Sequence, residues 1–241
     1  MWEFFSKSSY LNTGILKGLT DWHSHILPGV DDGIETINDS IELLKEYERA
    51  GIRKVWLTPH IMEDIPNTTS SLKTQFELLK SEWHGNVELR LASENMLDSL
   101  FSERLKNGDL LPIGERGRHL LVETSYFNPP YRMEESLSMI REKGYDVLLA
   151  HPERYVYMDE KEYNKLKSQG VLFQLNLLSL TGMYGKVAQK KAQWLMQKGY
   201  VDLLGSDIHR YYHFNNFFGE KCLTKKTLVA LSDIIQKESV F

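Results

Sequence analysis

Two histidines near the start of the chain are the first residues whose spacing suggests chemistry. They lie two positions apart in the segment Asp21-Trp22-His23-Ser24-His25. In a β-strand, residues i and i+2 point to the same face, so the two imidazoles would lie side by side. Neutral imidazole is a common ligand of divalent metal ions. The pair alone is a weak signal, because two unrelated surface or core histidines give the same pattern.

Six further residues with metal-binding side chains stand at the ends of later apolar runs, where we expect strands to end. They are His60, Glu94, Glu123, His151, Asp207 and His209. The carboxyl ends of the parallel strands of a β/α barrel meet on one face, where active sites are built. Taken singly, each residue has an ordinary interpretation as a strand cap, a helix cap or a loop residue. Their joint placement indicates a metal site.

The predicted ligands are all nitrogen and oxygen donors. This chemistry suits manganese, zinc or iron rather than a thiolate-rich structural zinc site. Eight ligands are too many for one four-coordinate ion, so we expect two or three divalent ions, with Glu123 in a position to bridge. Multinuclear sites of this kind activate water and contact both the attacking and the leaving oxygen of a phosphoryl group.

Two arginines beside the predicted ligands offer contacts for phosphate oxygens. Arg154 lies three residues after His151, and Arg210 directly follows His209. A guanidinium group binds phosphate with two parallel hydrogen bonds, although a surface salt bridge is the alternative for either residue. Aromatic residues in the loops on the same face either line a slot for an aromatic substrate or pack locally; these are Tyr126, Phe127, Tyr155 and Tyr157.

The elements that must position these residues follow a βαβα pattern, in which short apolar runs alternate with amphipathic segments. We expect strands over residues 19–25, 54–58, 87–92, 120–122, 146–150, 171–175 and 201–204. We expect helices over residues 36–50, 70–83, 98–106, 134–143, 159–168, 186–197 and 224–237. Seven strands with helices between them predict an α/β fold, a TIM-like (β/α)7 barrel, in one domain spanning residues 1–241.

The composition excludes several classes of protein. The 241 residues carry a formal net charge of -4, and nucleic-acid-binding proteins are usually basic, so we predict no nucleic-acid partner. The single cysteine, Cys222, excludes a disulfide framework and a cysteine-rich zinc site. It also excludes a cysteine-dependent tyrosine phosphatase, which needs an arginine six positions later, where this chain has Leu228.

No membrane or export signal is evident. No stretch approaches the roughly 20 apolar residues that a membrane helix needs. Residues 1–19 lack the uninterrupted apolar core and the small-residue cleavage site of a signal peptide. We therefore expect a cytoplasmic protein without stable membrane insertion, and we make no prediction of its oligomeric state.

Four motifs together resemble the polymerase and histidinol phosphatase (PHP) superfamily. They are HSHILPGVDDG at residues 23–33, Thr58-Pro59-His60, HPERY at residues 151–155 and SDIH at residues 206–209. The first motif is similar to one branch of that superfamily, the bacterial capsule-associated protein tyrosine phosphatases. The similarity covers about residues 19–213.

This resemblance implies a distorted seven-stranded β/α barrel with a three-metal site, often of manganese, with iron, zinc or magnesium as alternatives. It implies that the eight residues above are ligands and that Arg154 and Arg210 contact phosphate. The implied substrate is phosphotyrosine on the tyrosine-rich tail of an autophosphorylating kinase that controls polysaccharide export. Either His209 or a metal-bound water would assist the departure of the tyrosine phenolate.

One departure and three rival functions accompany the resemblance. Asn95 stands where relatives tend to have an aromatic residue, which changes a packing contact and not the ligand Glu94. The first rival is a small-molecule phosphoesterase such as a histidinol phosphatase. The second is an amidohydrolase, which commonly has a modified lysine where this chain has Glu123. The third is a non-catalytic protein that binds the kinase tail through a degenerate site.

Overall fold

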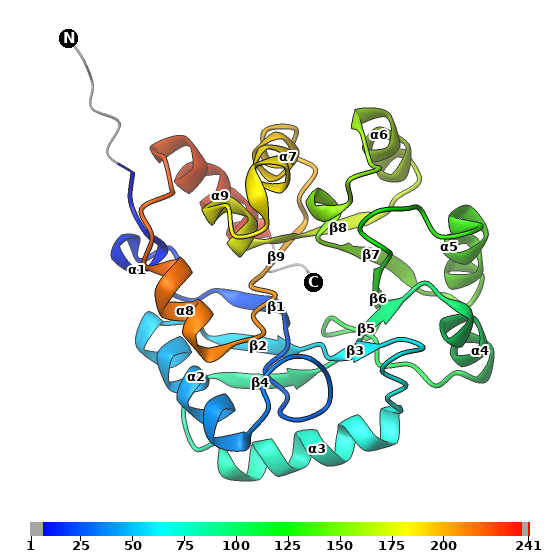
Figure 1. Cartoon of the computed structure of the whole chain (residues 1–241), viewed down its shortest axis with the longest axis horizontal. Helices are drawn as coiled ribbons and strands as arrows, with labels where there is room; N and C mark the ends of the chain where they lie inside the picture. Colours follow the sequence, from blue (N-terminus) through cyan, green and yellow to red (C-terminus); the bar gives the residue numbers. More distant parts are fainter. Residues whose placement is uncertain (1–6, 238–240) are drawn as a thin grey trace.

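The strands of this computed structural model, which describes residues 7–237 and 241, form two parallel sheets. One sheet contains β1 (Thr20–Ser24), β2 (Lys54–Leu57) and β4 (Glu88–Leu91), in that order. The other runs in the order β3 (His60–Ile61), β5 (Glu94–Met96), β6 (His119–Glu123), β7 (Asp146–Ala150), β8 (Leu172–Asn176) and β9 (Leu203–Gly205). The six-stranded sheet is curled, and Figure 1 shows the helices outside the strands.

Two of the predicted strands are each followed by a short second segment that joins the other sheet. The first break lies at Thr58-Pro59, between β2 and β3, and the second at Ala92-Ser93, between β4 and β5. Proline has no N–H to give to a ladder, which favours the first break. The described residues therefore contain nine strand segments, and the predicted count of seven is not confirmed.

The outer edges of the two sheets meet where β1 and β9 end. The backbone N–H of His25 donates to the carbonyl of Ile208 at 3.1 Å, and the N–H of Asp207 donates to the carbonyl of His23 at 2.8 Å. Ser24 and Ile208 form a parallel bridge. These contacts bring the segment after β9 against the segment that carries the two histidines.

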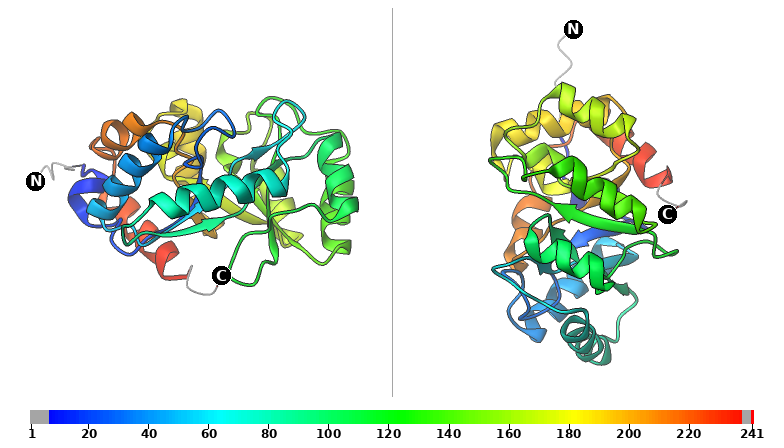
Figure 2. Two further views of the ribbon diagram at one scale, coloured as in Figure 1. Left: turned by 90° about the horizontal axis from the view of Figure 1, so that it is seen from below. Right: turned by 90° about the vertical axis from the view of Figure 1, so that its right-hand side faces the viewer.

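Every predicted helix is present, with ends within one residue of the expected ones. They are α2 (Ile37–Ala50), α3 (Thr69–Glu82), α4 (Ser99–Asn107), α5 (Met133–Glu142), α6 (Glu160–Ser168), α7 (Gly185–Gln197) and α9 (Lys225–Lys237). Thr36 caps α2 as predicted, because its hydroxyl accepts the N–H of Asp39 at 3.1 Å. Figure 2 shows from two further sides that the helices cover the strands.

Four short helical segments were not predicted. They are α1 (Tyr10–Thr13), η1 (Pro152–Arg154), η2 (Leu177–Thr181) and α8 (Tyr211–Phe218). The sequence of α8 is rich in aromatic residues, which are only moderate helix formers. Phe214 and Phe218 lie four apart on one face and are both buried, so packing rather than propensity stabilises this helix.

Most strands are buried on both faces, which explains their nearly continuous apolar runs, whereas β4 is only partly buried and Arg90 on it is exposed. In β7, Val147 and Leu149 belong to the core beneath the helices, whereas Leu148 and Ala150 pack inside the curled sheet. The inner cluster also contains Trp22 and Trp56, whose rings stack with centroids 5.9 Å apart. Side chains therefore fill the space between the strands below the strand ends.

No helix between residues 7 and 237 is long and apolar enough to cross a membrane. The expected absence of a signal peptide concerns residues 1–19, of which residues 1–6 lie outside the described part of the chain.

A buried carboxylate, Asp21, connects three elements below the strand ends. Its Oδ1 accepts the N–H groups of Ser206 at 2.8 Å and His23 at 3.2 Å, and its Oδ2 accepts the hydroxyl of Tyr47 at 2.7 Å. Asp21 and Tyr47 are almost completely buried, and burial raises the pKa of the Asp21 carboxyl. The α2 helix is thereby joined to β1 and to the turn after β9.

We predict that Tyr47→Phe lowers the free energy of unfolding by about 1–3 kcal/mol, because it leaves a buried carboxylate oxygen without its donor. Urea denaturation measures the change. Tyr200→Phe is the matched control, since Tyr200 donates a comparable hydrogen bond to Asn164 at the surface; we expect a loss below about 0.5 kcal/mol there. Equal stabilities of the two variants would contradict the prediction.

Candidate metal centre

All eight residues predicted as ligands lie together at the carboxyl ends of the strands, and Glu94 is at their centre. Its Oε2 lies 3.1 Å from Nε2 of His23 and 3.3 Å from Nε2 of His25. The same oxygen is 3.1 Å from Nδ1 of His60, and Oε1 is 2.9 Å from Nε2 of His151. Glu94 itself is fully buried. One carboxylate therefore contacts four imidazoles.

Glu123 and Asp207 extend this cluster on two sides. Glu123 Oε1 lies 2.9 Å from Nδ1 of His60, and Oε2 lies 3.8 Å from Nε2 of His151. Asp207 Oδ1 lies 3.4 Å from Nε2 of His25 and 3.5 Å from Nδ1 of His209. Of the three carboxylates, Glu94 has the most imidazole neighbours, and the expected bridging role of Glu123 stays a prediction.

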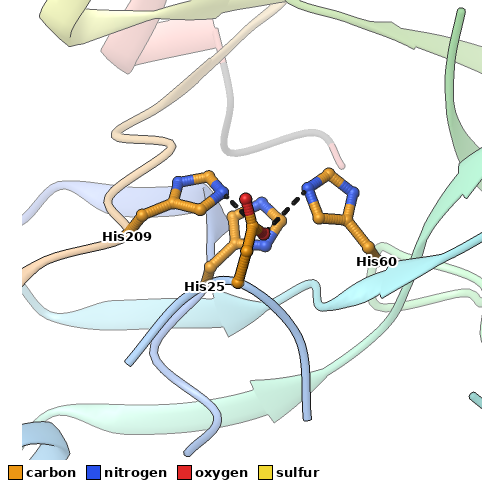
Figure 3. Close-up of side chains that lie close together, drawn as sticks. His25, His60 and His209 are labelled. Carbon is orange, nitrogen blue, oxygen red and sulfur yellow. Dashed lines mark ion pairs between the residues drawn. The ribbon is translucent and has the colours of Figure 1, made fainter. Parts of the chain in front are cut away.

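The ligand-type atoms form four overlapping groups that could each hold a metal ion. The groups are His23–His25–Asp207, His23–Glu94–His151, His60–Glu94–Glu123 and His25–Asp32–His60–His209. Figure 3 shows the imidazoles of the last group gathered around one carboxylate, with which His60 and His209 form ion pairs. The ring centroids of His25 and His209 are 3.9 Å apart. Several residues belong to two groups, as expected when neighbouring ions share ligands.

Three buried polar atoms in one of these groups lack a hydrogen-bond partner, which a metal ion would supply. Nδ1 of His60, Oε2 of Glu94 and Oε1 of Glu123 make no hydrogen bond with any described residue. Nδ1 of His60 nevertheless lies 3.1 Å from Oε2 of Glu94 and 2.9 Å from Oε1 of Glu123. Buried polar atoms normally have hydrogen-bond partners, so a convergence of nitrogen and oxygen atoms without partners indicates a site for a cation.

The histidine pair that begins the cluster is not presented by a regular strand. The ladder between β1 and β2 is irregular between Asp21 and Ser24, and β1 ends before His25. The two Nε2 atoms of His23 and His25 are still only 3.1 Å apart. The two imidazoles therefore lie side by side, as predicted, although the end of β1 that carries them is irregular.

Two ligand-type residues have backbones in the left-handed region. His151 has a φ of 32° and Asp207 a φ of 54°. Such conformations are costly for residues with a Cβ and concentrate at functional sites, where the surrounding structure holds them. His151 directly follows β7, and Asp207 lies two positions after the end of β9. The unusual backbone turns each side chain inward over the strand ends.

Electrostatics inside the cluster favours charged carboxylates. Burial alone would raise the pKa of Glu94, but the neighbouring His23 and His60 lower it well below its ordinary value. Burial likewise raises the pKa of Asp207, and His23 and Arg154 outweigh it, so the pKa is lowered. Burial and His25 lower the pKa of His60, yet Glu94 and Glu123 raise it to about 9 overall.

Residues that sequence reasoning missed hold the ligands in place. Asp31 Oδ2 lies 2.8 Å from Nδ1 of His25 and also accepts the backbone N–H of His60 at 3.0 Å. Asp31 precedes Asp32, the additional ligand-type residue, in the turn that ends at Gly33. A Cβ at Gly33 would lie 2.3 Å from the carbonyl oxygen of His25, so this turn needs glycine. The sequence signal for both carboxylates was the Asp-Asp-Gly turn itself.

A cavity of about 370 Å³ opens over the cluster. Its lining includes both predicted arginines, and its residues are Asp32, His60, Tyr126, Arg154, Met183, Tyr184, His209, Arg210, Tyr212 and His213. The Arg154 guanidinium lies 4.3 Å from the ring centre of Tyr126 and 4.1 Å from that of Tyr184, and donates to Asp207 Oδ2 at 2.6 Å. Arg210 donates to the carbonyl of Gly33 at 2.6 Å.

Of the four predicted aromatic residues, one lines this cavity. Tyr126 lines it, whereas Tyr155 is fully buried and packs in the core. The hydroxyl of Tyr157 lies 2.7 Å from that of Thr124, and Phe127 is 71% exposed. Sequence reasoning missed Tyr184, which follows η2 and has no pattern that distinguishes it from a core tyrosine.

An α/β fold with clustered metal-binding side chains at the strand ends defines a broad class of metalloproteins. A sequence model of the family described as capsular polysaccharide synthesis, CpsB/CapC, matches residues 19–220, and the chain belongs to this family. The match confirms the resemblance that the four motifs predicted.

Individual relatives agree with this assignment. The chain is 28% identical to the tyrosine-protein phosphatase YwqE of Bacillus subtilis over 203 residues, which cover 79% of this chain and 77% of that protein. It is 26% identical to the tyrosine-protein phosphatase CpsB of Streptococcus pneumoniae over 204 residues, covering 79% and 83%.

The fold is shared with a solved structure from the crystallographic work on YwqE and CpsB, which describes them as metal-dependent tyrosine phosphatases. The TM-score is 0.77 at 23% identity, and the alignment covers 91% of this chain and 92% of the other. This likeness shows that the curled parallel sheet with outer helices is the fold of the family.

We predict that metal affinity rises with pH between about 6 and 9. The pKa of His60 is raised to about 9 and that of His25 well above its ordinary value, so both imidazoles carry a proton at neutral pH in the metal-free protein. An imidazole must lose this proton to bind a cation, so binding releases protons and becomes tighter as pH increases. Calorimetric titration in two buffers of different ionisation enthalpy measures this release; heats that do not depend on the buffer would contradict it.

Proposed function

We propose that this chain is a metal-dependent phosphatase that hydrolyses phosphotyrosine on a protein. The observation that carries the proposal is the buried convergence of imidazoles and carboxylates around Glu94, directly beneath a cavity lined by Arg154 and Arg210. The curated relatives YwqE and CpsB are named as tyrosine-protein phosphatases, which supports the same activity here.

The proposed cofactor is two or three divalent ions. The family resemblance favours manganese over iron, zinc and magnesium, and the imidazole and carboxylate donors are compatible with it. The proposed ligands are His23, His25, His60, Glu94, Glu123, His151, Asp207 and His209. When bound, such ions supply positive charge for phosphoryl oxygens and an activated water as nucleophile.

The side chains of the protein bind and orient the substrate. Arg154 is held between two tyrosine rings above the cluster, where its free N–H groups are placed to bind the phosphoryl oxygens. Arg210, from the segment after β9, lines the same cavity and adds a second cation. Both guanidinium groups offset the charge that develops on the phosphoryl oxygens.

We propose His209 as the acid for the departing phenolate, a role that requires a proton, rather than a metal ion, on its Nε2. Its side chain is 20% exposed, so it lies at the mouth of the cluster rather than within it. Nδ1 donates to the backbone carbonyl of Asp207 at 3.0 Å, and Nε2 lies 3.5 Å from Oδ1 of Asp32. A tyrosine phenolate, with a phenol pKa of about 10, leaves readily with such help.

A larger cavity beside the cluster supports a polypeptide substrate over a small metabolite. It has a volume of about 720 Å³, and Met96 and Ser125 contribute to its lining. Met96 comes two positions after Glu94, and Ser125 comes two positions after Glu123. The strands that carry the two carboxylates, β5 and β6, are paired. The chain on either side of a phosphotyrosine would have room there. We propose the tyrosine-rich tail of an autophosphorylating kinase for polysaccharide synthesis as the substrate.

The fold and setting complete the proposal. We propose that the two sheets act as one distorted seven-stranded barrel, in which β2 with β3 and β4 with β5 each count as one broken strand, in a single domain over residues 1–241. The contacts between β1 and the segment after β9 support closure. We propose a cytoplasmic location, where the kinase tail would lie.

The proposed activity predicts hydrolysis of a phosphotyrosine peptide that is lost when metal is removed by a chelator and restored by added manganese. The Cys222→Ser variant should keep at least about half of the activity, because burial raises the pKa of this thiol to about 11 and leaves it un-ionised at neutral pH. Phosphate release measures both. Full activity after thorough metal removal would sink the proposal.

The same assay separates two of the three rival functions from the proposed one. Faster turnover of histidinol phosphate than of phosphopeptide would favour a small-molecule phosphoesterase. Binding of a kinase-tail peptide without any turnover by the metal-loaded protein would favour a non-catalytic binding role.

A further inference from the structure

The two oxygens of Asp207 have different surroundings. Oδ1 faces the imidazoles of His25 and His209, at 3.4 Å and 3.5 Å. Oδ2 instead accepts three hydrogen bonds, from Arg154 at 2.6 Å, from Nδ2 of Asn176 at 2.6 Å and from the hydroxyl of Tyr184 at 3.1 Å. A carboxylate oxygen has about two lone-pair sites, so three donors saturate it. Only Oδ1 stays available to a metal ion.

Asn176 belongs to a chain of hydrogen bonds along β8. Its Oδ1 accepts from Nε2 of Gln174 at 2.9 Å, and Oε1 of Gln174 lies 2.7 Å from Nδ1 of His23. Gln174 and Asn176 are two positions apart on one strand, so they share a face. Both are fully buried. The chain thus runs from Asp207 after β9, across β8, to His23 on β1.

The donor and the acceptor in each of these hydrogen bonds follow from the two ends of the series. An ionised carboxylate can only accept, so Asn176 must turn its NH2 group toward Asp207 and its oxygen toward Gln174. Gln174 then turns its NH2 group toward Asn176 and its oxygen toward His23. The backbone N–H of His151, which can only donate, also points to that oxygen at 3.4 Å, which supports the same orientation independently.

The consequence falls on His23. Because the Gln174 oxygen can only accept, Nδ1 of His23 must carry a proton and donate it. The other ring nitrogen, Nε2, is then free of a proton when the ring is neutral, and it is the atom that faces Glu94 and His25. An outer partner that sets the tautomer in this way is common around metal-binding histidines.

We propose that Gln174 and Asn176 are positioning residues that hold His23 in its metal-binding tautomer and Asp207 in a single-oxygen binding mode. The strand β8 supplies none of the proposed ligands, yet its side chains support His23 on β1 and Asp207 after β9. Tyr184 adds the third donor to Asp207 and packs against Arg154, so it connects the proposed ligand to the proposed phosphate-binding group. This inference rests on the proposed metal-dependent function.

The test measures Mn²⁺ binding to chelator-stripped protein by calorimetric titration. Asn176→Leu removes the hydrogen bonds of Asn176 to Asp207 and Gln174 at similar side-chain size. Asn176→Asp is a second, isosteric variant that places a carboxylate against Asp207. We expect both to bind Mn²⁺ roughly ten- to one-hundredfold more weakly than the unmodified protein. Asn164→Leu is the matched control, since Asn164 is exposed on α6, and it should bind with unchanged affinity.

A second readout distinguishes positioning from general destabilisation. In the zinc-loaded protein, heteronuclear NMR should show a slowly exchanging Nδ1 proton on His23, and both Asn176 variants should lose its protection. Unchanged Mn²⁺ affinity together with a protected His23 proton in both variants would overturn the inference. Tight Mn²⁺ binding by the unmodified protein without any phosphopeptide hydrolysis would overturn only the proposed function. The Mn²⁺ affinities of the Asn176 variants would then still decide whether Gln174 and Asn176 position the ligands.

Discussion

The structure depends on the burial of three carboxylates among five imidazoles at one end of the strands. Glu94, Glu123 and Asp207 are at most 1% exposed, in a protein whose interior is largely apolar. Burying an unpaired charge costs several kcal/mol, so each carboxylate needs a cationic partner or a metal ion. Glu94 contacts four imidazoles at 3.3 Å or less, an arrangement that a fold without a cation-binding role has no reason to maintain.

The backbone around this cluster is shaped to meet that constraint. His151 and Asp207 have left-handed conformations, and the β1 ladder is irregular beside His23. The strands break at Thr58-Pro59 and Ala92-Ser93, immediately before His60 and Glu94 begin the short segments β3 and β5. Five departures from regular structure thus lie at or next to proposed ligands, which agrees with the tendency of strain to gather at functional sites.

The parts of the fold that could be predicted are those governed by local patterns. Helices such as α2 have a cap at Thr36, a glycine end at Gly51 and a regular apolar face, so their limits follow from the sequence. The proposed ligands were predictable because parallel strands bring their carboxyl ends to one face. The CpsB/CapC match confirms the family that these motifs indicated.

The parts that could not be predicted depend on tertiary contacts. The division of two strands into β2 with β3 and β4 with β5 requires knowledge of which sheet each half joins. Gln174 and Asn176 lie in an apolar run where a buried amide has no local signature, and only their partners His23 and Asp207 reveal a role. The role of Tyr184 likewise becomes evident only from its contact with Arg154, which is distant in sequence.

The metal content of the protein purified without added metal, measured by elemental mass spectrometry, tests the central claim most directly. The account predicts two or three divalent ions per chain, mainly manganese, with fewer in an Asp207→Ala variant that removes a ligand shared with His23 and His25. A folded, catalytically active protein that contains less than one ion per chain would contradict the account.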